Sequence, residues 1–514
     1  MNRFMKMFVR IAVVLYLVQD SYSARILASV STASYSHQIA FRPIWKELAK
    51  RGHEIVLMTT DLMEETENIR QIDMSFSYEI LEERNYNSLM TNEVKNSIIR
   101  LVTIISDIFH DISFKQIKLP EVQQIINNKS EHFDLIMMEL IFPIHLGLIE
   151  KIKAPVIALT SMDAPPDLYY SMGSGSHPIL NAQLLFDSFP MTLWQRLVTV
   201  VGGFFIENYY SMYLLSSMKA EMRATFGENC RSLEELMEDI DMLFVNTNPF
   251  FHNIRPLVPN TISFGGGSHI EAKNKPLPED LKNFLDSATD GFIYFSLGTN
   301  VRSNLLNENL KRIFLETLSE LPYKVLWKFE NTTLKSDNIM TKDWVPQGNV
   351  LGHPNIKLFI TQCGLHSTEE AILKRVPMVA IPFIGDQPFN ARIVVKKEMG
   401  LSLDYLTLTK ESLKEAIIEV ITNTKYKEGV TEMANLFTDV EMTGLEKVVW
   451  WTEYVIRNKG AKHLKIPVTK IPFYQRYCLD VILAVIMMIC TSFFCIKKSF
   501  SVIRKLSFNK KKRD

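Results

Sequence analysis

One histidine of the chain stands where it could act as a general base. His37 lies in the stretch STASYSHQIAFRPIW (31–45), directly after an apolar run, where the pattern predicts the start of a helix. A neutral imidazole there could take the proton from a hydroxyl and so make its oxygen a nucleophile. The start of a helix disfavours the imidazolium, which would keep the base free at neutral pH. The alternative is a structural histidine that caps the helix.

A second stretch, LFITQCGLHSTEEAILKRVP (358–377), has the pattern of a binding site for an anion. Its apolar run ends in small and polar residues, and a helical pattern follows in which Ser367 precedes Glu370 by three positions, as in a capping box. The free N–H groups and the dipole of a helix that starts after a strand favour an anion. Gln362 and Gly364 lie in the turn where the anion would bind. A capping box without a ligand is an equal alternative for Ser367 and Glu370.

Further groups suit the parts of a nucleotide sugar. The indole of Trp344 offers a flat face for a base, with Gln347 beside it in the same turn. The Glu370 carboxylate could accept hydrogen bonds from ribose hydroxyls, and Asp386 and Gln387, just beyond a strand end, from sugar hydroxyls. We interpret this last pair as functional, because a structural role is hard to assign to it, whereas Trp344 could also be simple core. A second turn, FSLGTN (295–300), would aim Thr299 at the same cleft.

The elements that must position these residues form two alternating series of strands and helices. The first has predicted strands at 25–31, 54–60, 133–139, 155–161 and 242–248, with a single helix at 38–50 after the first of them. The second has predicted strands at 291–298, 324–329, 356–361 and 377–383. Such alternation predicts βαβ units and parallel sheets. The stretch at 258–280, rich in Pro, Gly and charge, is the best linker between them. We therefore expect an α/β protein with a ligand cleft at the carboxyl ends of the strands.

Seven segments together resemble one family. They are RPLVPN (255–260), YFSLGTNV (294–301), WVPQ (344–347), LGHP (351–354), VPMVAIP (376–382), GDQPFNA (385–391) and VVWWTEYVIRNKGAKHLK (448–465). They are similar to the donor-binding signature and the later helical segment of the UDP-glycosyltransferases, the family that includes the UDP-glucuronosyltransferases. The likeness is greatest to the membrane-bound members from animals and arthropods, and it covers essentially the whole chain.

The resemblance implies two Rossmann-like domains that face a cleft, the glycosyltransferase B type. The expected divisions are a signal peptide (1–23), an acceptor-binding domain (24–265), a UDP-sugar-binding domain (266–445), a helical segment that packs back toward the first domain (446–476), a transmembrane helix (477–496) and a basic cytosolic tail (497–514).

The resemblance also implies roles for single residues. His37 would be the catalytic base, and Glu139, at the end of a predicted strand, matches an aspartate that the family pairs with its histidine. Glutamate is one methylene longer, so the chemistry is kept while the geometry changes. Asp134, at the start of that strand, is the less favoured partner. The implied donor-binding residues are Thr299, Trp344, Gln347, Gln362, Gly364, Ser367, Glu370, Asp386 and Gln387.

Gln362 departs from the family, in which many members have histidine at this position. A glutamine amide can donate to the diphosphate but carries no positive charge, and the loss of a charge-assisted bond costs about 1 kcal/mol or more. His366 stands where asparagine is common. The alternative to an active enzyme is therefore a catalytically silent member that binds a nucleotide sugar or a lipophile.

Both ends of the chain predict a membrane protein. Arg3, Lys6 and Arg10 surround the start of an apolar run that fits a signal peptide. The run 477–496 is long enough to span a bilayer, and the last 18 residues hold eight Lys and Arg against one acid. We expect a single-pass protein of the endoplasmic reticulum with a lumenal body, in which Asn128 and Asn331 are glycosylation sequons. For the aromatic-rich stretch 193–215 we weigh an acceptor-pocket wall, a membrane-surface segment and plain core packing.

The charge and the cysteines of the body argue against a nucleic-acid site and against a metal site. Residues 24–476 hold 46 basic and 54 acidic residues, which is unfavourable for a general nucleic-acid binder. Cys230 and Cys363 have no metal-like spacing, and neither a metal site nor a disulfide is predicted. The expected partners are UDP-glucose or UDP-glucuronate, a small lipophilic acceptor such as a xenobiotic, and the membrane; no cofactor is expected, and self-association stays open.

Overall fold

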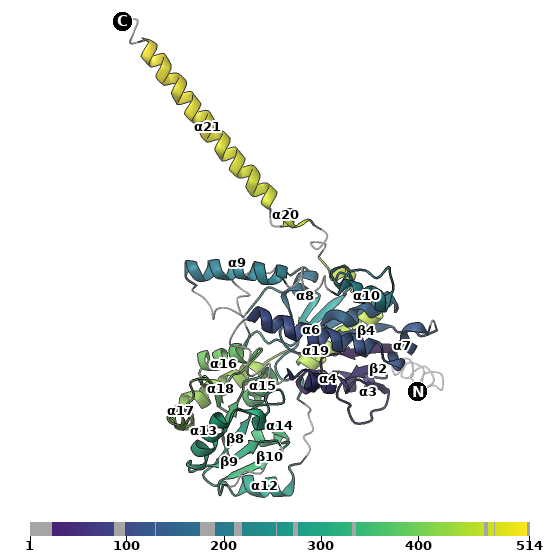
Figure 1. Cartoon of the computed structure of the whole chain (residues 1–514), viewed down its shortest axis with the longest axis vertical. Coiled ribbons are helices and arrows are strands. Elements are labelled where there is room, and N and C mark those ends of the chain that lie inside the picture. Colours follow the sequence, from purple (N-terminus) through teal and green to yellow (C-terminus); the bar gives the residue numbers. More distant parts are fainter. Residues whose placement is uncertain are drawn as a thin grey trace, which may run out of the picture. The chain divides into compact units, whose positions relative to one another are not determined.

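The computed structural model describes residues 23–86, 98–128, 130–174, 191–209, 218–252, 254–270, 276–330, 336–466, 471–476 and 478–510. The chain divides into two compact units, residues 1–464 and 465–514. Figure 1 labels the elements of both. The first 22 residues of the predicted signal peptide, Asn331 and the last four residues lie outside the described part of the chain.

The first unit contains two parallel sheets, as predicted. The first has the strand order β3-β2-β1-β4-β5-β6-β7, with neighbouring strands parallel throughout. Its strands are β1 (Arg25–Val30), β2 (Glu54–Thr59), β3 (Ile69–Asp73), β4 (Leu135–Glu139), β5 (Val156–Thr160), β6 (Met242–Val245) and β7 (Thr261–Ser263).

The second sheet has the order β10-β9-β8-β11-β12-β13 and is also parallel. Its strands are β8 (Phe292–Ser296), β9 (Lys324–Lys328), β10 (Ile339–Lys342), β11 (Ile356–Thr361), β12 (Met378–Ala380) and β13 (Gly400–Ser402).

Helices cover both sheets (Figure 1). Those before β8 are α2 (Tyr35–Ile39), α3 (Arg42–Lys50), α4 (Ser77–Glu83), α6 (Ile98–Ile117), α7 (Pro120–Asn127), η1 (Pro143–Glu150), α8 (Pro166–Ser171), α9 (Leu193–Tyr209), α10 (Lys219–Phe226), α11 (Leu233–Met237) and α12 (Glu279–Asp286). Those after it are η3 (Ser303–Leu305), α13 (Glu308–Ser319), α14 (Gln347–Leu351), α15 (Leu365–Leu373), α16 (Gln387–Lys396), α17 (Lys410–Thr422), α18 (Thr424–Thr438), α19 (Gly444–Asn458) and η4 (Lys462–Leu464).

The central strands are apolar on both faces because both faces are covered. Along β1, Leu27 belongs to one buried cluster, while Ile26 and Ala28 belong to another on the opposite face of the sheet. The second cluster also contains Val448 and Val455 of α19. The segment that follows the second sheet thus packs on a face of the first.

Two boundary predictions were wrong. The single helix expected at 38–50 is two helices, α2 and α3, because Pro43 lies in the first turn of α3 and supplies no N–H for a continuous helix. The predicted linker at 258–280 contains β7, which pairs with β6, and the start of α12.

The second unit contains α20 (Phe473–Arg476) and α21 (Leu479–Lys510), which is longer than the predicted span. The stretch Leu479–Lys505 contains an 18-residue window with a mean hydropathy of 2.5, and no residue of that window is buried in the structure. Its length and composition are compatible with a single-pass membrane protein.

The side chains of α9 contradict one of the three alternatives for the stretch 193–215, that of plain core packing. Leu193, Trp194, Leu197 and Phe205 are exposed large apolar side chains, so the described part of this stretch is not plain core packing. The acceptor-wall and membrane-surface alternatives stay predictions.

Candidate active site

The predicted catalytic pair meets at the carboxyl ends of adjacent strands. His37 lies in α2, directly after β1, and Glu139 is the last residue of β4, which pairs with β1. His37 Nδ1 is 2.7 Å from Glu139 Oε1 and 2.8 Å from the hydroxyl of Ser161, which follows β5. If the Nδ1–H donates to the carboxylate, Nε2 is left as a proton acceptor. Asp134 instead accepts a hydrogen bond from the backbone N–H of Arg25.

The pair holds opposite charges in a buried place. Burial opposes protonation of His37, but the charge of Glu139 and its hydrogen bond outweigh it, with a further contribution from Asp386, so the pKa of His37 is raised. This direction is opposite to the one expected from the start of a helix. Burial would raise the pKa of Glu139, but the charge and hydrogen bond of His37 lower it. Glu139 therefore stays ionised and favours the imidazolium that a general base forms.

The predicted anion turn follows β11, but the helix begins earlier than expected. Gly364 is the N-cap of α15, no side chain caps that helix, and Ser367 is its third residue. The predicted capping box of Ser367 and Glu370 was therefore wrong. Both side chains instead accept hydrogen bonds from the Gln347 amide, each at 3.0 Å. Three predicted donor-binding residues thus form one cluster.

Asp386 and Gln387 have structural contacts that the sequence did not reveal. Asp386 Oδ2 accepts from the backbone N–H of Leu365 at 3.1 Å and from the amide of Asn390 at 2.7 Å. Gln387 Oε1 accepts from the backbone N–H groups of Phe383 and Ile384. Our interpretation that this pair lacks a structural explanation was therefore wrong. Burial raises the pKa of Asp386, and its charge is close enough to influence His37.

The Gln362 side chain packs against Gly298, in the turn that follows β8. The side chain is buried, and its Oε1 has no hydrogen-bond partner among the described residues. A Cβ added to Gly298 would lie 2.2 Å from Gln362 Nε2, and Gly298 has a φ of 75°. Gly298 therefore makes the room that the Gln362 amide fills, and the half-buried Thr299 follows it.

Trp344 is not core. Its side chain is 56% exposed, and its ring meets Tyr35 of α2 edge to face at a centroid distance of 5.1 Å. The ammonium of Lys328 lies 5.8 Å from the same ring and donates to the Gly298 carbonyl at 2.8 Å. An open indole face beside a buried cation suits an aromatic base near phosphate groups.

Sequence reasoning missed Lys328 and Ser161. Lys328 is paired with Glu330 at 3.0 Å, and a lysine directly after the apolar run Val325–Trp327 was the signal that could have revealed it. Ser161 gave no such signal, because its contact with His37 joins residues 124 positions apart.

Contacts between the two sheet regions bring the two groups of residues together. The Ser34 hydroxyl donates to Asn300 Oδ1 at 3.0 Å, and the Asn246 amide donates to His366 Nε2 at 3.0 Å. The predicted catalytic and donor-binding residues consequently surround one site. Among the described residues, no group of three His, Cys, Asp or Glu side chains is placed to hold a metal ion.

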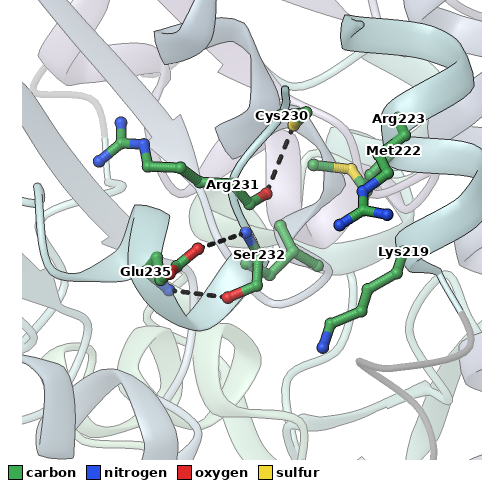
Figure 2. A pocket seen from close by; sticks show the side chains of 8 residues that line it. Lys219, Met222, Arg223, Cys230, Arg231, Ser232 and Glu235 are labelled. Atoms are coloured by element: carbon green, nitrogen blue, oxygen red, sulfur yellow. Dashed lines mark hydrogen bonds between the residues drawn. The ribbon is translucent and has the colours of Figure 1, made fainter. Parts of the chain in front are cut away.

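The remaining predicted residues lie elsewhere. Asn128 is exposed, and its Oδ1 accepts from the Ser130 hydroxyl at 2.7 Å. Cys230 and Cys363 are both free and buried. A cavity of about 260 Å³ between α10 and α11 contains none of the predicted site residues; Figure 2 shows Lys219 and Arg223 of α10 beside it.

Comparison with known proteins gives consistent matches along the chain. Residues 25–514 match the family model described as UDP-glucoronosyl and UDP-glucosyl transferase. The chain is 31% identical over 519 residues to an ecdysteroid UDP-glucosyltransferase of Spodoptera littoralis nuclear polyhedrosis virus, covering 95% of this chain and 99% of the relative. It is 30% identical to UDP-glucosyltransferase 2 of Dactylopius coccus, over 94% of this chain and 93% of the relative. It is 28% identical to human UDP-glucuronosyltransferase 2B7, over 91% of both chains.

Solved structures agree on the fold. The glycosyltransferase of kitacinnamycin has a TM-score of 0.54 and 17% identity, covering 84% of this chain and 99% of its own. The calicheamicin glycosyltransferase CalG4 has a TM-score of 0.54 and 15% identity, covering 85% and 99%. The expected glycosyltransferase B fold is confirmed.

Proposed function

Because this chain belongs to the UDP-glucoronosyl and UDP-glucosyl transferase family, we propose that it transfers glucose or glucuronic acid from a UDP-sugar to a hydroxyl of a small lipophilic acceptor. The observation that carries the proposal is the buried contact of His37 with Glu139, on the same site as the cluster of Gln347, Ser367 and Glu370. His37 would remove a proton from the acceptor, and the cluster of Gln347, Ser367 and Glu370 would bind the UDP-sugar.

In the proposed reaction His37 Nε2 takes the proton of the acceptor hydroxyl. The acceptor oxygen then attacks the anomeric carbon, the bond from that carbon to the diphosphate oxygen breaks, and UDP leaves with inversion of the anomeric centre. Glu139 orients the imidazole through Nδ1 and stabilises its charged form, while Ser161 contacts the same nitrogen. The UDP-sugar is a co-substrate, and the proposal needs no metal or other cofactor.

The donor contacts are proposed residue by residue. Trp344 would stack on uracil, Gln347 would contact the uridine and Glu370 the ribose. Gln362 and Gly364, in the turn after β11, and Ser367 of α15 would hold the diphosphate, Thr299 would face the same cleft from the turn after β8, and Asp386 and Gln387 would hold the sugar. Asp386 and Gln387 have structural partners, yet amide and carboxylate groups retain hydrogen-bonding capacity beyond those contacts.

We place the protein in the endoplasmic reticulum membrane, with the body lumenal, the tail cytosolic and a role in the conjugation of lipophiles. The apolar helix α21 supports a membrane anchor. Relatives named as ecdysteroid UDP-glucosyltransferases make UDP-glucose and a sterol the first pair to assay.

The test is sugar transfer by membranes that carry the full chain. Labelled UDP-glucose and UDP-glucuronate are offered with a panel of phenols and sterols. We expect transfer from one donor, and its loss in His37→Ala. His132→Ala is the matched control, because His132 is an exposed histidine whose side chain also faces a carboxylate, that of Asp134. Equal transfer by wild type and His37→Ala would contradict His37 as the base.

A second candidate is a silent binder, and Gln362 is the observation that favours it. The glutamine amide is buried at the diphosphate turn and cannot carry positive charge. Binding of UDP without transfer to any acceptor in the panel would favour this candidate.

A further inference from the structure

A histidine from the segment between the two sheets lies buried beside the proposed ribose carboxylate. His269 comes two positions after three consecutive glycines, Gly265 to Gly267, and is 6% exposed. Its Nδ1 is 3.4 Å from Glu369 Oε2, and its Nε2 is 3.6 Å from Glu370 Oε1. One imidazole thus faces two adjacent carboxylates of α15.

The glycines allow this close approach. The backbone N–H of Gly266 donates to Glu369 Oε1 at 2.7 Å. Gly267 has a φ of 85°, and a Cβ there would lie 2.3 Å from the side chain of Leu373. The segment can lie directly on α15 only because it has no side chains at these positions.

Each oxygen of the Glu370 carboxylate faces a side chain. Oε2 accepts from the Gln347 amide at 3.0 Å, and Oε1 faces His269. Each carboxylate oxygen can accept more than one hydrogen bond, so both keep capacity for hydroxyl groups of a ligand. The group is oriented before a donor binds.

Charge favours an imidazolium at this place. Burial opposes protonation of His269, but the nearby carboxylates of Glu369 and Glu370 outweigh it and raise its pKa to about 9. His366 also lies beside His269, with 4.5 Å between the centroids of the two rings. Burial, together with the charges of His269 and His37, keeps the pKa of His366 well below its usual value. One positive charge therefore balances two adjacent carboxylates.

We propose that His269 is a positioning residue for the UDP-sugar, whose buried ring holds the Glu370 carboxylate oriented toward the hydroxyls of the donor ribose. The inference rests on the proposed function and adds a residue outside the donor signature to it. His269 touches Glu370 and acts through it, because its own ring is buried behind the carboxylate.

The test uses the full chain and avoids leaving a buried charge unpaired. His269→Asn alone would leave the buried Glu369 carboxylate without its histidine neighbour, so the variant is His269→Asn combined with Glu369→Gln, and Glu369→Gln alone is the reference. We expect the double variant to raise the KM for the UDP-sugar about tenfold over the reference, with kcat and the acceptor KM within about twofold. Glu370→Gln should raise the same KM. His53→Asn is the matched control, since His53 is a buried histidine facing Glu453 at 3.7 Å, among other residues.

Several outcomes would overturn the inference. A donor KM equal to that of Glu369→Gln, or a loss confined to kcat, would show that His269 does not position the donor. Calorimetric titration with UDP separates this from failure of the proposed function: equal UDP affinity in the double variant and in its reference overturns the inference alone. Absence of UDP binding by the wild type overturns both.

Discussion

At the scale of single residues, the Glu139 side chain is long enough to reach His37 from the end of β4. Glu139 is the last residue of a fully buried strand, and its carboxylate still reaches His37 Nδ1 at 2.7 Å. The predicted partnership is therefore geometrically possible with glutamate at this position. The sequence could pair these residues by analogy, but not place Ser161 on the same nitrogen, because that contact depends on the packing of β5 beside β4.

Replacement of Glu139 by Gln should change both the rate and its pH dependence. Only neutral His37 can accept a proton, and the pKa of His37 is raised, so transfer by the wild type should increase as pH rises through that raised value. Without the carboxylate charge the pKa falls, so the acid limb should move to lower pH, while kcat falls by about 10²-fold to 10⁴-fold. The measurement is kcat/KM against pH for both proteins. An acid limb that does not move would mean that Glu139 does not set the protonation of His37.

Replacement of Gln362 by His should strengthen UDP binding, and more at low pH. An imidazole at this turn could donate to the diphosphate and carry charge below its pKa, a gain of about 1 kcal/mol, or roughly fivefold in affinity. Calorimetric titration with UDP at pH 6 and pH 8, each referred to the wild type at that pH, measures it. A weaker affinity at both values would indicate that the space over Gly298 accepts only the glutamine amide.

At the scale of elements, the central strands could be predicted and the edge strands could not. Strands such as β4 are buried along their whole length and are apolar throughout. The edge strand β3 reads IRQID and is partly exposed, so it lacks the run that marks a buried strand. The start of α15 was misplaced for a related reason: Asp386, 21 residues later, accepts the Leu365 N–H, and a contact from a distant segment leaves no local pattern.

The turn after β8 gives a prediction about packing between elements. Gly298→Ala would place a Cβ 2.2 Å from Gln362 Nε2 at a positive φ, so we expect about 1–3 kcal/mol less stability and weaker UDP binding. Denaturant unfolding and UDP titration measure the two effects. Gly203→Ala is the control, since a Cβ there meets nothing within 4 Å. Equal stability of the two variants would contradict the tight contact.

At the scale of the whole molecule, the site exists only where two sheet regions meet. The hydroxyl of Ser34 reaches Asn300, and Tyr35 meets Trp344, so the turn that carries His37 also contacts the second region. The family resemblance implied a cleft, and the alternation of strands and helices implied two sheets, but neither specified these contacts. They depend on how two separately folded cores pack, which no local pattern encodes.

Substitution of Trp344 tests this arrangement through UDP binding. A ligand that binds the folded state raises the free energy of unfolding of the protein. UDP at a hundredfold its Kd should raise the free energy of unfolding by about 2.7 kcal/mol. Trp344→Ala removes a stacking surface worth about 1–3 kcal/mol for one base, so most of the UDP-induced rise should vanish. Since the indole is 56% exposed, the stability without UDP should fall by no more than about 1.5 kcal/mol. Trp450→Ala, at another exposed tryptophan, should keep the rise. A full UDP-induced rise in Trp344→Ala would mean that the base binds elsewhere, whereas a large loss without UDP would mean that Trp344 joins the two regions rather than the donor.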